Sequence, residues 1–374
     1  MHVILPVSSD PRDPRPGGVM SYSLGLARFL LRTGTSVEFL CTGVDGEDQG
    51  AKMTAVAGAV SGELPFARAL ARHARFHRFP SDSVVAANSE LYAWALGRSG
   101  QSLPIVLIAH GPKAPTLRRS RPVMGRAFQL LIEPRALRLS RFVVAIDRES
   151  QEYFAVRYPQ DRIHRIPLGI DVEHFRPIDR TAARTRWSVT GHPVVLFVGR
   201  LAPEKRPLLA IEAYHHIRAK VPDSVLLIAG TGRLQREVET RGAKEGRDRV
   251  RSLGVVPRVG LPSLYSTADV VLMTSDFEQF PNVVLESLAC GTPVVSTPVG
   301  DVREILDEPQ LGAVAGRSEV ELARSLLTTF PESDEERVAR QGVRVKRAES
   351  FSWNRVGPQI ASVLHAALET GSNQ

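Results

Sequence analysis

Short runs of apolar, often β-branched residues recur along this chain, and each is followed by a longer stretch with helical periodicity. Such runs occupy residues 2–7, 37–40, 83–87, 104–109 and 142–146 in the first half, and residues 193–199, 224–230, 268–273 and 292–297 in the second. Continuous apolar strands that alternate with helices are typical of parallel sheets covered on both faces. We therefore expect two doubly wound α/β domains, with ligands at the loops beyond the carboxyl ends of the strands.

The length of 374 residues fits two domains that each bury a core. The segment after residue 165 carries two prolines, a glycine and a charge-rich stretch before the next helical pattern begins. We expect an N-terminal domain over residues 1–177, a C-terminal domain over residues 178–350 and a closing helical segment over residues 351–374. The linker is expected near residues 175–179.

Cysteine content and hydropathy exclude several classes of protein. Cys41 and Cys290 are too few and too far apart for a disulfide scaffold or a zinc cluster, so we expect two buried thiols in a reducing compartment. The first residues lack the apolar core of a secretory signal. No uncharged apolar stretch reaches the roughly 18 residues that a spanning helix requires. A cytoplasmic protein is expected, with contact to the inner face of the cell membrane left open.

The net charge of +8 is concentrated in the first half of the sequence. Residues 1–178 hold 23 Lys and Arg against 16 Asp and Glu, an excess of 7, whereas residues 179–374 hold 25 against 24, an excess of 1. Between residues 113 and 141 a single acid, Glu133, accompanies Lys113, Arg118, Arg119, Arg121, Arg126, Arg135, Arg138 and Arg141. Such a cluster indicates either an anionic partner or a solvated basic face.

The segment over residues 275–295 carries the sharpest chemical pattern. A loop after an apolar strand leads into a helix that starts near Pro281 and ends before Gly291. The first turn of a helix offers free N–H groups to a phosphate, and Glu278 and Glu286 on either side could accept hydrogen bonds from sugar hydroxyls. Ordinary surface glutamates near a helix start are the alternative.

Arg200 and Lys205 follow the strand at residues 193–199, where a planar guanidinium and a compact ammonium suit a diphosphate. Solvent-facing cations remain the alternative. Glycines that allow close approach of a phosphate to the backbone follow other strands, namely Gly17, Gly18, Gly230 and Gly232. His110 ends the strand at residues 104–109, where it could contact a substrate or stabilise the strand end.

Patterns for several other chemistries are absent from the sequence. There is no nucleophile elbow, no G-x-x-x-x-G-K-[ST] phosphate loop and no H-E-x-x-H zinc pattern. The dinucleotide fingerprint is also absent, so a nicotinamide enzyme is not favoured.

In combination, these segments closely resemble glycosyltransferase family 4, the retaining nucleotide-sugar glycosyltransferases with the GT-B fold. The resemblance runs nearly end to end. It rests on GGV at 17–19, AH at 109–110, IPLGIDVEHFRP at 166–177, FVGRLAPEK at 197–205, AGTG at 229–232, EQFPNVVLES at 278–287, GTPVV at 291–295 and FSW at 351–353. Glu278 and Glu286 have the spacing of that family's paired-glutamate signature.

The resemblance implies a GT-B fold, in which two Rossmann-like domains face each other across a cleft, and it implies roles for single residues. Glu278 and the backbone after it, through Phe280, Pro281, Asn282 and Val283, would hold the donor sugar, and Glu286 the ribose. Arg200 and Lys205 would bind the diphosphate and stabilise the leaving group. Gly17, Gly18, Gly230 and Gly232 would line the donor site, and His110 would lie near the donor sugar. No metal and no cofactor are expected. The terminal helix would cross back onto the first domain.

The sequence departs from the family pattern at three positions. Leu168 stands where asparagine is usual, Gln279 where glycine commonly follows the first glutamate, and Asn88 where histidine often follows the third strand. None of these changes removes a diphosphate contact, but Gln279 adds a side chain beside the donor sugar, so the sugar is not predicted.

The first domain is expected to bind the acceptor. The segment over residues 121–142 interleaves Met124, Phe128, Leu131 and Leu139 with arginines, which predicts either a basic amphipathic helix on an anionic membrane or a helix packed on the core. We predict a retaining, metal-independent hexosyltransferase of cell-surface polysaccharide or glycolipid biosynthesis, with a lipid-linked or anionic glycan as acceptor. The alternatives are an epimerase or phosphorylase of the same fold and a basic nucleic-acid-binding protein. Few aromatics and no known module make nucleic acid an unexpected partner.

Overall fold

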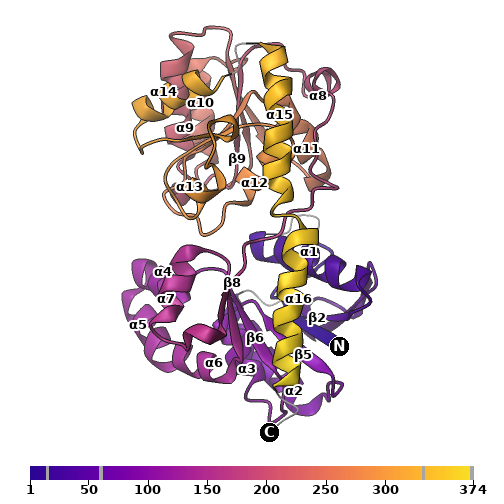
Figure 1. The fold of residues 1–374 in the computed structure, drawn as a ribbon. Helices are drawn as coiled ribbons and strands as arrows, with labels where there is room; N and C mark the ends of the chain where they lie inside the picture. The colour runs from indigo at the N-terminus through magenta and orange to yellow at the C-terminus, as the bar shows by residue number, and fades with distance from the viewer. Residues whose placement is uncertain (14–16, 59–61, 331–332, 371–374) are drawn as a thin grey trace. The chain divides into compact units, whose positions relative to one another are not determined.

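The chain folds into two compact units in a computed structural model that describes residues 1–13, 17–58, 62–330 and 333–370 (Figure 1). The side chains of Arg119 and Ser120 lie outside the described part. One unit comprises Met1–Gly169 together with Trp353–Gln374, and the other comprises Ile170–Ser352.

Within the described residues the first unit holds an eight-stranded sheet in the order β3-β4-β2-β1-β5-β6-β7-β8. All neighbouring strands are parallel except β3, which runs antiparallel to β4. The strands are β1 His2–Pro6, β2 Ser36–Thr42, β3 Gly46–Asp48, β4 Ala51–Ala57, β5 Ser83–Ala87, β6 Ile105–Ala109, β7 Phe142–Ala145 and β8 Ile163–Arg165.

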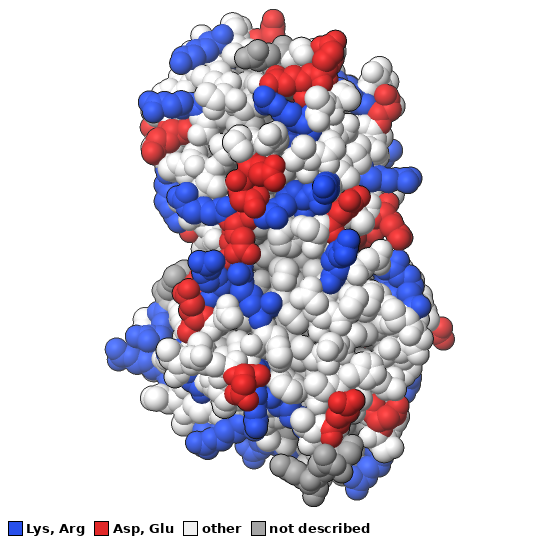
Figure 2. Space-filling view, viewed as in Figure 1, with Lys and Arg blue, Asp and Glu red and all other residues white. Residues whose placement is uncertain are grey.

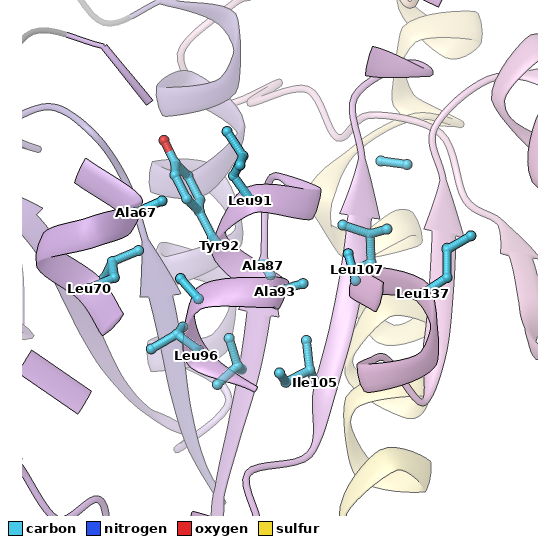
Figure 3. Packing of buried hydrophobic residues seen from close by; sticks show 14 of the residues in the cluster. Ala67, Leu70, Ala87, Leu91, Tyr92, Ala93, Leu96, Ile105, Leu107 and Leu137 are labelled. Carbon is cyan, nitrogen blue, oxygen red and sulfur yellow. The ribbon is translucent and has the colours of Figure 1, made fainter. Parts of the chain in front are cut away.

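Helices cover both faces of this sheet, as the sequence pattern predicts. They are α1 Gly18–Arg32, α2 Glu63–Phe76, α3 Glu90–Leu96, α4 Lys113–Ser120, α5 Pro122–Leu131, α6 Glu133–Leu139, α7 Arg148–Ala155, the short η1 Gln160–Arg162 and α16 Trp353–Glu369. On one face, Leu70 of α2, Leu91 and Leu96 of α3 and Leu137 of α6 pack with Ile105 in a single apolar cluster (Figure 3).

The terminal helix α16 belongs to the first unit, where it packs against α1 and lies over the central strands. Glycines allow this close approach. A Cβ atom added at Gly25 of α1 would meet the ring of Trp353 at 2.2 Å, and one added at Gly357 would meet the ring of Phe29 at 2.5 Å. Both distances are shorter than any packed side chain tolerates, so larger residues at these positions would push α16 away from α1.

Within the described residues the second unit holds a six-stranded parallel sheet in the order β11-β10-β9-β12-β13-β14. Its strands are β9 Val194–Val198, β10 Val225–Ala229, β11 Val250–Gly254, β12 Val270–Met273, β13 Val294–Ser296 and β14 Gly312–Val314. Its helices are α8 Arg180–Arg186, η2 Pro203–Lys205, α9 Pro207–Arg218, α10 Gln235–Glu245, η3 Arg258–Gly260, α11 Leu261–Thr267, α12 Asn282–Ala289, α13 Val302–Ile305, η4 Pro309–Leu311, α14 Glu319–Thr329 and α15 Asp334–Glu349.

A buried carboxylate fastens α8 to the strands of the second unit. Asp269 contacts Arg180 at 2.5 Å and Arg184 at 3.1 Å, and it accepts a 2.7 Å hydrogen bond from the backbone N–H of Val194. Burial raises the pKa of Asp269, but the bond from His192, the charge of Arg180 and the Val194 N–H outweigh it and lower the pKa to about 2. The carboxylate is therefore charged at neutral pH and holds the start of this unit in place.

The units divide at Gly169 and Ile170, whereas the sequence predicts a boundary between residues 177 and 178. The intervening residues are not a free linker, because the N–H of Ile170 donates to the Phe351 carbonyl at 2.8 Å and Phe175 is fully buried. Ile178 continues the attachment by donating its N–H to Ser266 Oγ at 3.0 Å. The segment over residues 170–178 is thus part of the second unit.

Candidate functional site

Two loops at the carboxyl ends of β9 and β12 bring Lys205 and Glu278 together. These strands are neighbours in the sheet, so the loops that follow them meet at one edge. Lys205 Nζ forms an ion pair with Glu278 Oε1, and Ser275 Oγ donates to the same oxygen at 2.7 Å. Both charged side chains are mostly buried, with 21% and 17% of their surface exposed. A carboxylate and an ammonium are therefore held side by side in a partly desolvated position.

Hydrogen bonds from the second loop to the first fix this arrangement. Thr274 Oγ1 donates to the carbonyl oxygens of Lys205 and Arg206 at 2.9 and 2.8 Å. The N–H of Asp276 donates to the Glu204 carbonyl at 2.9 Å. Arg206 has a left-handed backbone with φ +47°, which turns the chain directly before α9 begins. The position of Lys205 is thus set by the loop after β12 as well as by its own loop.

Gly300, in the loop after β13, lies closely packed against the backbone of Glu278 and Gln279. It has a left-handed φ of +49°, and a Cβ atom there would lie 2.7 Å from the Glu278 carbonyl oxygen and 2.3 Å from that of Gln279. Only glycine avoids both the backbone strain and the collision. The sequence interpretation missed this residue.

Glu286 lies in α12, and its carboxylate accepts a hydrogen bond from a tyrosine. Tyr265 of α11 donates its hydroxyl to Glu286 Oε2 at 2.8 Å. Burial raises the pKa of the Glu286 carboxyl, while the Tyr265 bond and the charge of Arg258 act in the opposite direction. Because Tyr265 is fully buried, Glu286 is the acceptor through which its hydroxyl is satisfied.

The residues between the two glutamates build the start of α12. Pro281 caps the helix with an extended backbone and no side-chain hydrogen bond. The Val284 N–H donates to the Pro281 carbonyl at 3.1 Å, so the N–H groups that suit a ligand are those of Asn282 and Val283. Asn282 and Val283 are half-buried in this first turn. Phe280 is buried, and its ring lies 5.9 Å from that of Phe351.

Arg200 and the glycines after β10 stand apart from the ion pair. The Arg200 side chain is 75% exposed and contacts Glu204 at 3.2 Å, so it does not join Lys205 and Glu278. At Gly230 an added Cβ atom would lie 1.9 Å from the Gly199 carbonyl oxygen, and at Gly232 it would lie 2.4 Å from that of Leu201. Close packing between the loops after β9 and β10 therefore explains both glycines.

In the first unit, His110 is the first member of a buried hydrogen-bonded chain. Its Nε2 lies 2.9 Å from Asn88 Oδ1, Asn88 Nδ2 donates to Ser23 Oγ at 3.0 Å, and Ser23 Oγ donates to the Val19 carbonyl at 2.9 Å. This direction of donation places the proton on Nε2 and leaves Nδ1 as an acceptor. Burial lowers the pKa of His110 to about 4, so its imidazole is neutral near pH 7. Asn88, which departs from the family pattern, thus orients the histidine.

The start of α1 carries two glycines. Gly17 caps the helix in an extended conformation without a side-chain hydrogen bond, and among the described residues nothing lies within 4 Å of a Cβ added there. Gly18 is the first helical residue and is exposed. A helix start of this kind suits an anion, and the role of Gly17 and Gly18 at the donor stays a prediction.

The basic segment divides into different environments. Lys113 begins α4, pairs with Glu63 and donates to Ser89 Oγ at 3.3 Å, and burial lowers its pKa to about 8. Arg118, Arg121 and Arg126 are exposed, and the side chain of Arg119 lies outside the described residues. Lys113 is therefore held by a carboxylate and Arg141 by the Thr370 hydroxyl at 3.2 Å, whereas Arg118, Arg121 and Arg126 face solvent.

The expected amphipathic helix over residues 121–142 is wrong as a single element. Proline in the first turn of α6 begins a second helix after Ile132, and Phe128 is buried. The exposed face of α5 nevertheless carries Val123, Met124, Leu130 and Leu131. Figure 2 shows basic side chains on this side of the first unit with uncharged surface between them. Beyond α5, a groove of about 800 Å³ is lined by Arg138, Arg157 and Arg162 together with Leu130 and Leu137.

Neither metal binding nor membrane spanning finds support among the described residues. No group of three or more His, Cys, Asp and Glu side chains gathers there as a metal site requires. No described helix has the combination of length and apolar character that crossing a bilayer demands. The expectation that no metal or cofactor is needed stays a prediction.

Sequence comparisons assign the chain to a family. Residues 16–174 match the family described as Glycosyltransferase Family 4, and residues 179–342 match the family described as Glycosyl transferases group 1. The two matches together span most of both units. The chain belongs to glycosyltransferase family 4, as the sequence resemblance predicts.

Several curated proteins are similar to part of the chain. A D-inositol 3-phosphate glycosyltransferase from Geodermatophilus obscurus is 35% identical over 216 residues, which are 54% of this chain and 47% of that protein. A GDP-mannose-dependent α-(1-6)-phosphatidylinositol monomannoside mannosyltransferase from Mycolicibacterium smegmatis is 28% identical over 243 residues, 61% and 63% of the two chains. The chain spans about half the length of the first of these relatives.

Solved structures confirm the fold. Sucrose-phosphate synthase from Thermosynechococcus elongatus matches with a TM-score of 0.80 at 20% identity, covering 99% of each chain. HepE from Anabaena, solved with UDP and glucose, matches with a TM-score of 0.75 at 19% identity, covering 98% of this chain and all of that one. The two doubly wound units have the GT-B fold that the sequence predicts.

Proposed function

We propose that this chain transfers a sugar from a nucleotide-diphosphate sugar to a hydroxyl acceptor, with retention of anomeric configuration and without a metal. The observation that carries the proposal is the Lys205–Glu278 ion pair at the carboxyl edge of the sheet in the second unit. Glu286 lies in α12, the helix that follows Glu278 in the sequence. A carboxylate binds hydroxyls, an ammonium binds a diphosphate, and the open start of α12 lies between the two glutamates.

In the proposed reaction Lys205 neutralises the diphosphate as it leaves. The bond between the anomeric carbon and the diphosphate oxygen breaks while a bond to the acceptor oxygen forms on the same face. The acceptor proton passes to the departing diphosphate, so no side chain has to act as nucleophile. Glu278 and the backbone of Phe280 to Val283 would hold the sugar hydroxyls, and Glu286 would hold the ribose. Arg200 would need to move from Glu204 to reach the diphosphate.

The acceptor is proposed to be a lipid-linked or anionic glycan in cell-surface polysaccharide or glycolipid biosynthesis. The names of two relatives support an anionic or lipid-linked acceptor, since one is named for inositol 3-phosphate, which is anionic, and the other for a phosphatidylinositol monomannoside, which is lipid-linked. We place acceptor binding in the first unit, with Gly17, Gly18 and the neutral His110 available for the donor. The basic surface of α4 and α5 would hold the protein at the inner face of the membrane, because exposed leucines and valine lie among arginines there.

Sugar transfer with a panel of labelled nucleotide sugars and a membrane extract as acceptor tests the proposal. We expect a glycosylated product whose new bond has the anomeric configuration of the donor, in equal yield with and without EDTA. An inverted product, or loss of transfer in EDTA, would contradict the proposed mechanism. Epimerised donor or phosphate-dependent release of sugar, without transfer, would favour an epimerase or a phosphorylase of the same fold.

A further inference from the structure

The segment over residues 166–177, which resembles the family pattern, has no role in the proposed reaction. In the structure its second half holds Arg258. Asp171 Oδ2 lies 3.4 Å from the Arg258 guanidinium, and His174 Nε2 lies 3.1 Å from the Arg258 carbonyl oxygen, which fits donation by the imidazole N–H. The guanidinium stacks over Phe175, 4.7 Å from the ring centroid. This segment therefore fixes a cation at η3.

The contacts continue from this segment to Glu286. The rings of Phe175 and Tyr265 meet edge to face, with centroids 6.2 Å apart. Both rings are fully buried, and the Tyr265 hydroxyl donates to Glu286 Oε2 at 2.8 Å. Tyr265 has little freedom to turn away, because its ring is packed and its hydroxyl is in a desolvated place.

We propose that Tyr265 is a positioning residue for nucleotide binding: it holds one oxygen of Glu286 so that the carboxylate is presented to the ribose hydroxyls of the donor. The inference rests on the proposed function, because it takes Glu286 as the ribose-binding group. It adds a residue that does not touch the donor and acts only through Glu286. Arg258, held by the 170–175 segment, acts in the same direction, because its charge favours the ionised form of Glu286.

The ionisation of Glu286 gives this arrangement a measurable signature. The ionisable groups around its carboxyl are Arg258 of η3, Tyr265 of α11 and Cys290 of α12 itself. From α15, Arg344 reaches only the far end of α12, where it donates to the Gly291 carbonyl at 3.1 Å. Burial raises the pKa of Glu286, and removal of the Tyr265 hydroxyl would raise it further. A protonated Glu286 is a poorer acceptor for ribose, so nucleotide affinity is expected to fall as the pH decreases.

Calorimetric titration of Tyr265→Phe tests the proposal. The probes are whichever of UDP, GDP and ADP binds the wild-type chain most tightly, and the 2′-deoxy form of the same nucleotide. We expect the wild-type chain to prefer the ribonucleotide, and Tyr265→Phe to weaken ribonucleotide binding about tenfold, as for one lost hydrogen bond to a charged group. The affinity for the 2′-deoxy nucleotide should fall less, so the ratio of the two affinities should be smaller in Tyr265→Phe than in the wild-type chain. The pH midpoint of ribonucleotide binding should move upward.

Tyr214→Phe is the matched control. Tyr214 is also a fully buried tyrosine of the second unit, and its hydroxyl donates to the Ser224 carbonyl at 2.6 Å, away from Glu286. Tyr214→Phe should lower the free energy of unfolding about as much as Tyr265→Phe. It should leave the preference for the ribonucleotide and the pH midpoint of its binding unchanged. If Tyr265→Phe keeps the wild-type preference and midpoint, the positioning role is refuted while the proposed function stands.

Arg258→Gln provides a second variant if Tyr265→Phe does not fold. It removes the charge that favours ionised Glu286 and leaves the tyrosine in place. The pH midpoint of ribonucleotide binding should again move upward, and an unchanged midpoint would contradict the proposal. A wild-type chain that binds none of the three ribonucleotides would instead overturn the proposed function, and this inference with it.

Discussion

Lys205 and Glu278 form a partly buried pair in which each side chain reduces the desolvation cost of the other. We predict that Lys205→Ala lowers the rate of sugar transfer by about 100-fold or more, as loss of a group that stabilises developing charge does in other enzymes. Enzyme kinetics at saturating donor, with thermal unfolding of the same sample, checks this prediction.

Lys220→Ala is the control, because Lys220 is an exposed lysine of the same unit and its removal changes the net charge equally. Transfer by Lys205→Ala at the rate of Lys220→Ala would show that Lys205 has no part in the reaction.

At the scale of single residues, the sequence could predict which side chains suit a nucleotide sugar, but only some of the side chains that contact them. The sequence predicts ligand contacts in the loops that follow two apolar strands, at Lys205 and at Glu278, and the strand order of the fold places these two loops side by side. The role of the Tyr265 hydroxyl could not be predicted, because a tyrosine in an apolar helical segment is indistinguishable in sequence from an ordinary core residue. Its acceptor, Glu286, lies 21 residues away and is known only from the fold.

Among the elements, the loop after β13 packs closely against the loop after β12. We predict that Gly300→Ala lowers transfer activity by about tenfold or more, since a Cβ atom there collides with the carbonyl oxygens of Gln279 and Glu278 and must shift them. Steady-state kinetics and the melting temperature of the variant measure the two effects.

Gly254→Ala separates displacement from backbone strain. Gly254 also has a left-handed φ, +66°, but an added Cβ atom would meet nothing within 4 Å. Both variants should lose stability by about 1 kcal/mol or more from strain. Equal transfer activity of Gly300→Ala and Gly254→Ala would mean that the added Cβ atom at Gly300 does not displace Glu278.

The strands with continuous apolar sequence could all be predicted, because burial on both faces leaves no other composition. Five shorter or more exposed strands were missed, namely β3, β4, β8, β11 and β14. β8 and β14 are half-buried three-residue strands at the sheet edge, and β3 and β11 expose polar residues, so their sequences carry little periodic signal. The break between α5 and α6 was missed because the apolar pattern continues through it.

Across the whole molecule the excess positive charge lies in the half that carries α4 and α5. We predict binding to vesicles of anionic phospholipid that weakens as salt rises from 50 to about 500 mM, since the Debye length falls to a few ångströms. Replacement of Leu130 and Leu131 by serine should reduce vesicle binding in a sedimentation assay. Serine at Val338, an exposed valine of the second unit, is the control.

Vesicle binding that does not depend on salt, or that is unchanged when Leu130 and Leu131 are replaced, would contradict the proposal that α5 binds the membrane. The distribution of charge along the sequence could not decide whether α5 binds a membrane. It located the cluster, but the structure shows that Lys113 is held by Glu63 while the exposed arginines flank an apolar face.

The central claim is that the second unit binds a nucleotide-diphosphate sugar through Lys205, Glu278 and Glu286. Its most direct test is the melting temperature of the chain in the presence of UDP-, GDP-, ADP- and dTDP-sugars. A donor at about 100 times its Kd should stabilise the native state by about 2.7 kcal/mol and raise the melting temperature. The Glu286→Ala variant should lose that rise. No rise with any nucleotide sugar, or an equal rise in Glu286→Ala, would contradict the account.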